Sequence, residues 1–534
     1  MKGTPCGQAS APSAAGLVVF THGSCKARRQ TIHKEAPVTI SQQHLESRLW
    51  SAANALRGPV AHADFMTYMF PMLFWKWISD TWTWEHEQAV ADFGDALNDE
   101  IEADYHRFDL PEGTHWNDVA RSTLPNLGAR IQKALDKIAQ ANAEKLAGIF
   151  GDAAWGNKER LPEEHLRNLI SSFDGLNLNP DEVSHDMLGQ AYEYLLKYFA
   201  EGAGQKAGEF FTPRQVVRLL VRLLDPQPEE TVYDPTCGSG GMLMETINTI
   251  RARGEDHRTL RLYGQEVNLT TSAIARMNLY LHEIEDFKIV RGDTLRAPGL
   301  RNPNGTLQKF DVVIANPPFS LKNWGRDTWE SDPRAFCGVP PKDKGDYAFI
   351  QHMIASMDEE RGRVGVVMPL GALFRAGAEG SIRACLVEKD LLEAVIGLGP
   401  NLFYGAAIPV CLMIFRKEKV EERKNKVLFI DATERVKTGR AQNELGDDDV
   451  DAILKAFHEG ADPDGDRGVN LRLVDLSEIE TNGYDLNIGR YVADAEAEAV
   501  DVTEALAAWQ EARADRLAAE EAMVERLRAA GFDA

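Results

Sequence analysis

The sequence predicts an α/β protein with a doubly wound sheet, preceded by an all-α N-terminal domain and followed by a helical C-terminal tail. From about residue 181 to residue 433, short β-rich runs alternate with helical stretches, which is typical of a largely parallel sheet covered by helices on both faces. Residues 41–174 instead place apolar side chains at three- and four-residue spacing, which indicates helices. The Ala/Glu/Arg-rich stretch from about residue 496 to residue 530 has one narrow apolar face and predicts an exposed helix.

The expected sheet has eight strands with helices between several of them. The strands are expected at residues 231–234, 260–266, 288–292, 310–315, 363–368, 392–397, 410–415 and 427–430. The helices are expected at residues 241–253, 268–282, 347–359 and 378–388. Sheets of this kind bind ligands at the carboxyl ends of their strands, so the residues that follow each strand are the candidates for function.

The length of 534 residues exceeds what one hydrophobic core supports, so several domains are expected. We divide the chain into an N-terminal extension (1–40), a helical domain (41–175), the domain of the sheet (176–435) and an acidic linker with a helical tail (436–534). The extension is rich in Ala, Gly, Ser and Thr and is expected to be a disordered tail. Alternatively the start is misassigned and the protein begins at Val38. The codon GTG, which encodes valine within a gene, can also initiate translation in bacteria.

The composition indicates a globular protein of the cytoplasm. Hydrophobic residues make up 44% of the chain and charged residues 26%, as in ordinary soluble domains. No window holds the roughly 18 uninterrupted apolar residues that a membrane span needs. The six cysteines are scattered and include no C-x-x-C pair. This spacing argues against a zinc site and against a disulfide framework, and it fits a reducing compartment.

A glycine-rich turn follows the first expected strand. Asp234 ends this strand, and Gly238, Ser239, Gly240 and Gly241 lead into a helix. Glycines permit a tight turn and a close approach of the backbone to a ligand, and the N–H groups at the start of the helix can bind a polar or negative group. The turn departs from the dinucleotide and nucleoside-triphosphate motifs, and alone it would also fit an ordinary strand–helix connection.

Acidic residues follow the next two strands. Glu266 ends the second strand, where a carboxylate can accept hydrogen bonds from two ribose hydroxyls. Asp293 follows the third strand, where it can accept a hydrogen bond from an adenine amine. Each alone would more often be a solvated strand end. Ligand-capable residues at the ends of three successive strands together favour a nucleoside site.

The motif after the fourth strand is the most specific. The apolar run 310–315 leads into Asn316, Pro317, Pro318 and Phe319. The prolines fix the backbone, so the Pro317 carbonyl can point outward beside the Asn316 side-chain oxygen. These two acceptors can hold both hydrogens of an exocyclic amine while Phe319 stacks on the ring. The alternative is a Pro-Pro turn that only ends a strand.

The order of these motifs resembles that of DNA amino-methyltransferases, specifically the modification subunit of Type I restriction-modification systems. The segment Gly-Glu-Phe-Phe-Thr-Pro-Arg at 208–214 is similar to the family's G-x-[FY]-[FY]-T-P-R motif. The resemblance covers about residues 41–433, and residues 1–40 have no counterpart. Further segments that resemble the family lie at 49–58, 344–349, 371–375, 401–405 and, more weakly, 483–487.

The resemblance implies a Rossmann-like methyltransferase sheet that binds S-adenosyl-L-methionine and methylates N6 of a flipped-out adenine at a specific DNA site. It places Asn316, Pro317, Pro318 and Phe319 at the target base. The expected cofactor-binding residues are Glu209, Phe210, Phe211, Thr212, Pro213, Arg214, Asp234, Gly238, Ser239, Gly240, Gly241, Glu266 and Asp293.

The expected chemistry needs neither a metal nor a covalent enzyme intermediate. The adenine amine is a poor nucleophile because its lone pair is delocalised into the ring. Hydrogen bonds to Asn316 and to the Pro317 carbonyl are expected to localise that pair, so that positioning and electrostatic preorganisation supply most of the catalysis. The base must first leave the duplex, which costs a few kcal/mol.

Other functions also fit parts of the sequence. An Asn-Pro-Pro-aromatic motif suits cytosine N4 and the side-chain amide of a protein glutamine as well as adenine, although the motif order resembles that of adenine methylases. A non-catalytic scaffold with a methyltransferase fold would show degraded motifs, and these look intact. A self-contained restriction enzyme would need a nuclease segment and a large recognition region, and we find neither.

The charge distribution indicates that this chain alone binds double-stranded DNA poorly and that a partner supplies much of the contact. The net charge is −23, and residues 445–534 carry 23 acidic against 8 basic residues, so −15 of it lies there. DNA contacts normally need a basic surface. The resemblance implies a DNA-specificity (S) subunit, a second copy of this chain and, as a further component, a restriction (R) subunit. The terminal helix is expected to dock on a partner or to fold back on its own domain.

Overall fold

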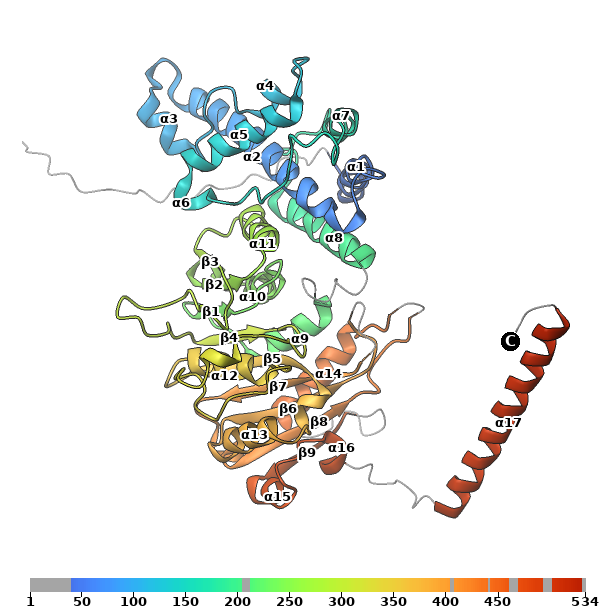
Figure 1. Cartoon of the computed structure of the whole chain (residues 1–534). Coiled ribbons are helices and arrows are strands. Elements are labelled where there is room, and N and C mark those ends of the chain that lie inside the picture. The colour runs from blue at the N-terminus through green and yellow to red at the C-terminus, as the bar shows by residue number, and fades with distance from the viewer. Residues whose placement is uncertain are drawn as a thin grey trace, which may run out of the picture. The chain divides into compact units, whose positions relative to one another are not determined.

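The computed structural model describes residues 40–203, 212–403, 408–439, 442–460, 469–492 and 502–530. Its central element is a nine-stranded sheet in the order β3-β2-β1-β4-β5-β7-β6-β8-β9 (Figure 1). The eight expected strands are present within a few residues. The strands are β1 (Thr231–Asp234), β2 (Arg261–Glu266), β3 (Phe287–Arg291), β4 (Val312–Ala315), β5 (Arg363–Pro369), β6 (Leu392–Leu398), β7 (Val410–Arg416), β8 (Lys426–Ala432) and β9 (Asn470–Asp475).

Parallel pairing dominates the half of the sheet that carries the motifs. β3, β2, β1, β4 and β5 are all parallel to one another, and β6 is parallel to β8. β7 is inserted antiparallel between β5 and β6, and β9 is antiparallel to β8. The order reverses between β1 and β4, because the chain continues from β1 to β2 on one side and from β4 to β5 on the other. The predicted doubly wound α/β fold is therefore confirmed, with an antiparallel addition.

Helices cover both faces of the sheet. Side chains of α9 (Arg214–Leu224), α10 (Gly241–Ala252) and α14 (Asp447–Glu459) share one hydrophobic core with alternate strand residues. Side chains of α12 (Asp346–Ser356) and α13 (Ala378–Glu388) share a second core with the intervening strand residues. All seven residues of β5 are buried, because each of its faces is covered by helices. α11 (Leu269–Leu281) follows β2.

The acidic stretch after residue 439 is more ordered than its composition suggests. We expected a linker there, but Asp447, Asp448 and Asp449 form the first turn of α14. Their negative charges stabilise the helix, because they lie at the positive end of its dipole. Asp447 also accepts a hydrogen bond from Arg218 on α9 over 2.8 Å. β9 escaped detection because it is an edge strand with mostly exposed side chains, so it has no hydrophobic alternation.

The N-terminal region is helical, as predicted. The aromatic run that the sequence places at residues 68–75 lies in the long helix α2, and its side chains are at most 3% exposed. These side chains therefore pack in a helical core and offer no exposed stacking platform for nucleic-acid bases. The helices are α1 (Gln42–Asn54), α2 (Phe65–Phe93), α3 (Asp99–Tyr105), α4 (Trp116–Ala120), α5 (Leu127–Ala141), α6 (Ala143–Leu146), α7 (Glu163–Ser171) and α8 (His185–Ala203).

The C-terminal stretch forms the helix α17 (Val502–Ala529). Its apolar side chains remain accessible: Leu506, Trp509 and Met523 are each more than half exposed. None of the described helices is long and apolar enough to cross a membrane. The predicted N-terminal extension lies outside the described residues, apart from Ile40.

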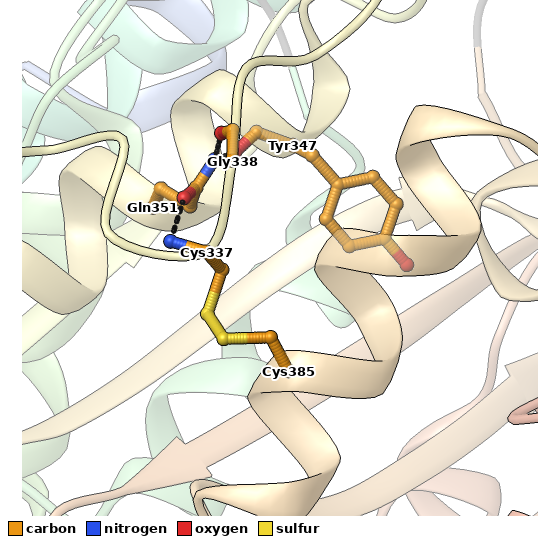
Figure 2. Close-up of a disulfide and its surroundings, with 5 residues drawn as sticks. All are labelled: Cys337, Gly338, Tyr347, Gln351 and Cys385. Carbon is orange, nitrogen blue, oxygen red and sulfur yellow. Dashed lines mark hydrogen bonds between the residues drawn. A yellow bond between two sulfur atoms is a disulfide. The ribbon is translucent and has the colours of Figure 1, made fainter. Parts of the chain in front are cut away.

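Cys337 and Cys385 form a disulfide, which the scattered cysteine spacing did not predict (Figure 2). Cys385 lies on α13, and Cys337 lies in the loop before α12. Gln351 on α12 holds this loop, since its side chain accepts a hydrogen bond from the Cys337 N–H and donates one to the Gly338 carbonyl, both over 3.0 Å. The expectation that the cysteines form no disulfide is wrong for this pair, because packing joins residues 48 positions apart.

Candidate active site

The residues that follow the motif-bearing strands lie at one edge of the sheet. Asp234 ends β1, Glu266 ends β2, and Asn316 directly follows β4. Because these strands are parallel neighbours, their carboxyl ends lie on the same side, at the point where the strand order reverses. In doubly wound sheets this point is the usual ligand site.

Two cavities open at this edge, with volumes of about 820 and 710 Å³. Asn316 lines both of them. The other expected residues that line the larger cavity are Thr212, Pro213, Arg214, Asp234, Gly238, Ser239 and Gly241. Those that line the smaller cavity are Glu266, Asp293 and Pro318. Glu209, Phe210 and Phe211 lie outside the described residues. The structure thus brings together predicted residues from five separate segments of the chain.

Backbone hydrogen bonds hold the glycine-rich turn in place. Gly238 and Gly240 have φ values of +51° and +81°, the left-handed conformation that glycine adopts without strain. The Gly238 N–H donates to Oε2 of Glu266 over 3.1 Å, and the Cys237 N–H donates to the Gln265 carbonyl over 3.1 Å. The turn is therefore fastened to the end of β2, and Gly240 lines neither cavity.

Asp234 is a fully buried carboxyl group within this turn. It is 2% exposed, and one of its oxygens accepts the Thr236 N–H over 2.9 Å. Burial, with a smaller contribution from the nearby Glu266 charge, raises the pKa of Asp234 to about 8. A buried carboxyl group without a cationic partner is unfavourable when ionised. Asp234 is therefore suited to bind a positively charged group of a ligand.

Glu266 and Asp293 differ in the partners of their carboxylates. The two oxygens of Glu266 accept the N–H groups of Gly238 and Asn268 over 3.1 and 2.8 Å. Asp293 accepts the N–H groups of Leu295 and Arg296, and its second oxygen forms an ion pair with the Arg296 side chain at 2.7 Å. The ion pair with Arg296 neutralises the Asp293 carboxylate, which makes Asp293 the weaker candidate for ligand binding.

Asn316 lines both cavities and carries an oxygen acceptor without a partner among the described residues. Its side-chain nitrogen donates to the Thr212 hydroxyl, 104 positions away along the chain, over 3.0 Å. The remaining oxygen, Oδ1, is buried and has no hydrogen-bond partner among the described residues. Leaving a buried acceptor unpaired costs roughly 1–3 kcal/mol. An unpaired oxygen of this kind can accept a hydrogen bond from an amine, as the sequence predicts for Asn316. The hydrogen bond between Asn316 and Thr212 joins two distant segments of the chain.

Aromatic rings flank the Asn-Pro-Pro-Phe loop. Pro317 is buried and fixes the backbone between Asn316 and Pro318. The Phe319 ring meets the Phe403 ring edge to face, with centroids 6.3 Å apart. Phe403 is not among the predicted site residues, although it lies in the segment 401–405, whose sequence resembles the family. A planar base can be accommodated against such rings by stacking.

A network of buried charges braces the exit of this loop. Ser320, which follows Phe319, has a φ of +51° and donates its N–H to Oδ1 of Asp346 over 2.7 Å. Arg375 contacts the same carboxylate and pairs with Glu379, whose Oε2 lies 2.6 Å from its Nε. The Asp346 and Glu379 side chains are almost completely buried. Sequence analysis missed this brace, because nothing in the motifs shows that Ser320 needs an acceptor.

Replacing Asp346 with alanine is expected to slow methyl transfer about ten- to a hundredfold, because small displacements of reacting groups have effects of this size. The substitution removes the acceptor that holds Ser320 in its unusual conformation. Asp346→Asn, which retains an oxygen for Ser320, is the matched control and should stay closer to the wild type. Single-turnover rates on DNA test this, and equal rates for both variants and the wild type would contradict the brace.

Comparison with known proteins identifies the family. Residues 183–499 match the family described as N-6 DNA Methylase. The chain belongs to this family. Residues 45–173 match the HsdM N-terminal domain, which corresponds to the helical region. The matched range includes the glycine-rich turn and the Asn-Pro-Pro-Phe loop, and the family implies the use of S-adenosylmethionine.

Individual relatives agree with this assignment. The Type I restriction enzyme MjaVII methylase subunit of Methanocaldococcus jannaschii is 36% identical over 417 residues, which cover 74% of this chain and 68% of the relative. The MpnII methylase subunit of Mycoplasma pneumoniae is 29% identical over 87% of this chain and 92% of its own. The crystal structure of a type I methyltransferase subunit from Streptococcus thermophilus has a TM-score of 0.73 and 29% identity, covering 85% of this chain and 100% of that one.

These matches confirm the function that the motifs predict. The chain is the DNA methyltransferase subunit of a Type I restriction-modification system, and it is adenine-specific. The family match favours adenine over cytosine N4 and over a protein amide, and it argues against a non-catalytic scaffold.

Proposed function

We propose that this chain binds S-adenosylmethionine across the two cavities at the sheet edge and methylates N6 of an adenine that is flipped into the site beside Asn316. The observation that carries the proposal is the buried, unpaired Oδ1 of Asn316, a residue that lines both cavities. An acceptor in this position is incomplete until a ligand donates a hydrogen to it.

The residues present fit S-adenosylmethionine. Asp234, buried in the larger cavity, suits the ammonium group of the methionine part. Glu266, at the end of β2 in the smaller cavity, suits the ribose hydroxyls. Thr212, Pro213 and Arg214 extend the methionine side of the site, with Glu209, Phe210 and Phe211 proposed beside them. When bound, the cofactor supplies an electrophilic methyl group: nitrogen forms the new bond, sulfur keeps the electrons of the broken one, and the amine releases a proton.

The Asn-Pro-Pro-Phe loop prepares the amine in this proposal. Asn316 Oδ1 and the Pro317 carbonyl accept the two N6 hydrogens and draw the nitrogen toward tetrahedral geometry. Phe319 stacks on the adenine ring, with Phe403 beside it. Donors and acceptors that are fixed before the reaction avoid reorganisation at the transition state, which is the main source of electrostatic catalysis.

The proposed assembly contains two copies of this chain, one specificity subunit and double-stranded DNA in the cytoplasm, and a restriction subunit can join it. The net charge of −23 supports the need for a partner that holds the DNA. The exposed apolar residues of α17 support docking of such a partner on this helix.

Methyl transfer from S-adenosylmethionine to DNA, with and without the specificity subunit, tests the proposal. Mass spectrometry of the digested nucleosides should show N6-methyladenine, and only when the partner is present. N4-methylcytosine would overturn the choice of base. The absence of any methylated nucleoside with a correctly assembled complex would overturn the catalytic proposal.

A further inference from the structure

Two residues join the cavities at the sheet edge. Among the described residues that line these cavities, only Thr236 and Asn316 line both. Each also has a buried oxygen without a partner among the described residues: Oγ1 of Thr236 and Oδ1 of Asn316. The proposed function uses the Asn316 oxygen to hold the amine, but it gives the Thr236 hydroxyl no role.

The backbone around Thr236 is fixed on both sides. The Thr236 N–H donates to the buried Asp234 carboxyl over 2.9 Å. The Pro235 carbonyl before it accepts the Thr294 hydroxyl over 2.6 Å, and the Cys237 N–H after it donates to the Gln265 carbonyl. The backbone at Thr236 is therefore held on both sides, and its unpaired hydroxyl is not the result of a loose turn.

The identity of the missing partner follows from the shape of the ligand. The larger cavity contains Asp234, for the ammonium end of S-adenosylmethionine, and the smaller contains Glu266, for its ribose. The sulfonium sulfur is the atom that connects the methionine part to the adenosine part. A molecule that spans both cavities must therefore carry its sulfur, and the methyl group on it, through the junction.

We propose that the Thr236 hydroxyl is a further catalytic residue, whose oxygen contacts the sulfonium methyl group and directs it toward the amine held by Asn316. This proposal rests on the proposed function. C–H groups donate weak hydrogen bonds to oxygen, and the positive charge on sulfur makes the methyl hydrogens stronger donors. An oxygen at this position also stabilises the cation before transfer. S-adenosylhomocysteine, which lacks both the methyl group and the charge, makes no such contact.

Comparison of S-adenosylmethionine with S-adenosylhomocysteine in the full-length chain tests the assignment. Thr236→Val removes the hydroxyl and keeps the branched shape, and Thr236→Ser keeps the hydroxyl. By calorimetry, Thr236→Val is expected to weaken S-adenosylmethionine binding about three- to tenfold and to leave S-adenosylhomocysteine binding within about twofold. Thr236→Ser should retain most of the wild-type preference. The thermal midpoints of the unliganded variants control for folding.

A spectroscopic measurement gives a second readout. With a ¹³C-labelled methyl group on S-adenosylmethionine, a C–H···O contact moves the methyl proton resonance downfield in the complexes of the wild type and of Thr236→Ser. The shift should be smaller with Thr236→Val. Equal weakening of both ligands by Thr236→Val would assign the hydroxyl to the ribose or the methionine instead and overturn the proposal, as would unchanged binding of both. Failure of the wild type to bind either ligand would overturn the proposed function itself.

Discussion

Replacing Asn316 with alanine is expected to lower the rate of DNA methylation about 10²–10³-fold, the cost of removing one preorganised hydrogen-bonding group from a transition state. The substitution deletes the unpaired Oδ1 and leaves the cavities otherwise intact. The affinity for S-adenosylmethionine, measured by calorimetry, should therefore stay within about threefold of the wild type. Single-turnover methyl transfer in the complex with the specificity subunit provides the rate.

Two variants separate the role of the oxygen from that of the side-chain shape. Asn316→Asp keeps an oxygen acceptor, and the Thr212 hydroxyl can donate to it, so this variant should retain more activity than Asn316→Ala. Thr212→Val removes the partner that orients the amide, and a smaller loss of about tenfold is expected. Equal loss of cofactor binding and of methyl transfer in Asn316→Ala would contradict a role at the target base.

Much of this site was predictable because it is built from strand ends. Asp234, Glu266 and Asn316 each follow an apolar run, and parallel strands bring the ends of such runs to one edge. The hydrophobic pattern of the strands therefore predicts that residues as far apart as 234 and 316, 82 positions, lie at the same edge of the sheet. The orientation of the Asn316 amide was not predictable, since it depends on the Thr212 hydroxyl, 104 positions away.

The features that escaped prediction depend on packing between segments without a local signal. The brace of Asp346, Arg375 and Glu379 acts on a backbone N–H, which every residue except proline carries. The Cys337–Cys385 disulfide depends on the position of a loop relative to α13. The edge strand β9 lacks a clear hydrophobic alternation, because most of its side chains are exposed. In each case the sequence contains the residues but not the distance between them.

A second large effect is expected at Asp234, where stability and cofactor binding oppose each other. The pKa of this carboxyl is about 8 in the folded chain, against about 3.9 in an unfolded one. Because the folded state holds the proton more tightly, the contribution of Asp234 to stability is greatest below pH 4 and declines as the pH rises to 8. Asp234→Asn removes this decline, so the unliganded variant should unfold at a higher temperature than the wild type at pH 8 and at nearly the same temperature at pH 4.

Cofactor binding should depend on pH in the opposite direction. An ammonium group pairs with the ionised form of Asp234, so binding below pH 8 releases the proton. The affinity of the wild type for S-adenosylmethionine should rise with pH by up to about tenfold per unit between pH 6 and 7.5. Calorimetry in buffers with different ionisation enthalpies should detect the release of about one proton. Asp234→Asn should bind weakly and with little dependence on pH.

The two measurements at Asp234 distinguish a ligand-binding carboxylate from a structural one. A carboxyl group that only supports the turn, through its hydrogen bond with the Thr236 N–H, would be replaced by asparagine without loss of cofactor affinity. A gain in stability together with a loss of affinity is expected only where the fold tolerates an unfavourable buried charge for the sake of a cationic ligand. Unchanged affinity in Asp234→Asn, with no proton release in the wild type, would remove Asp234 from the cofactor site.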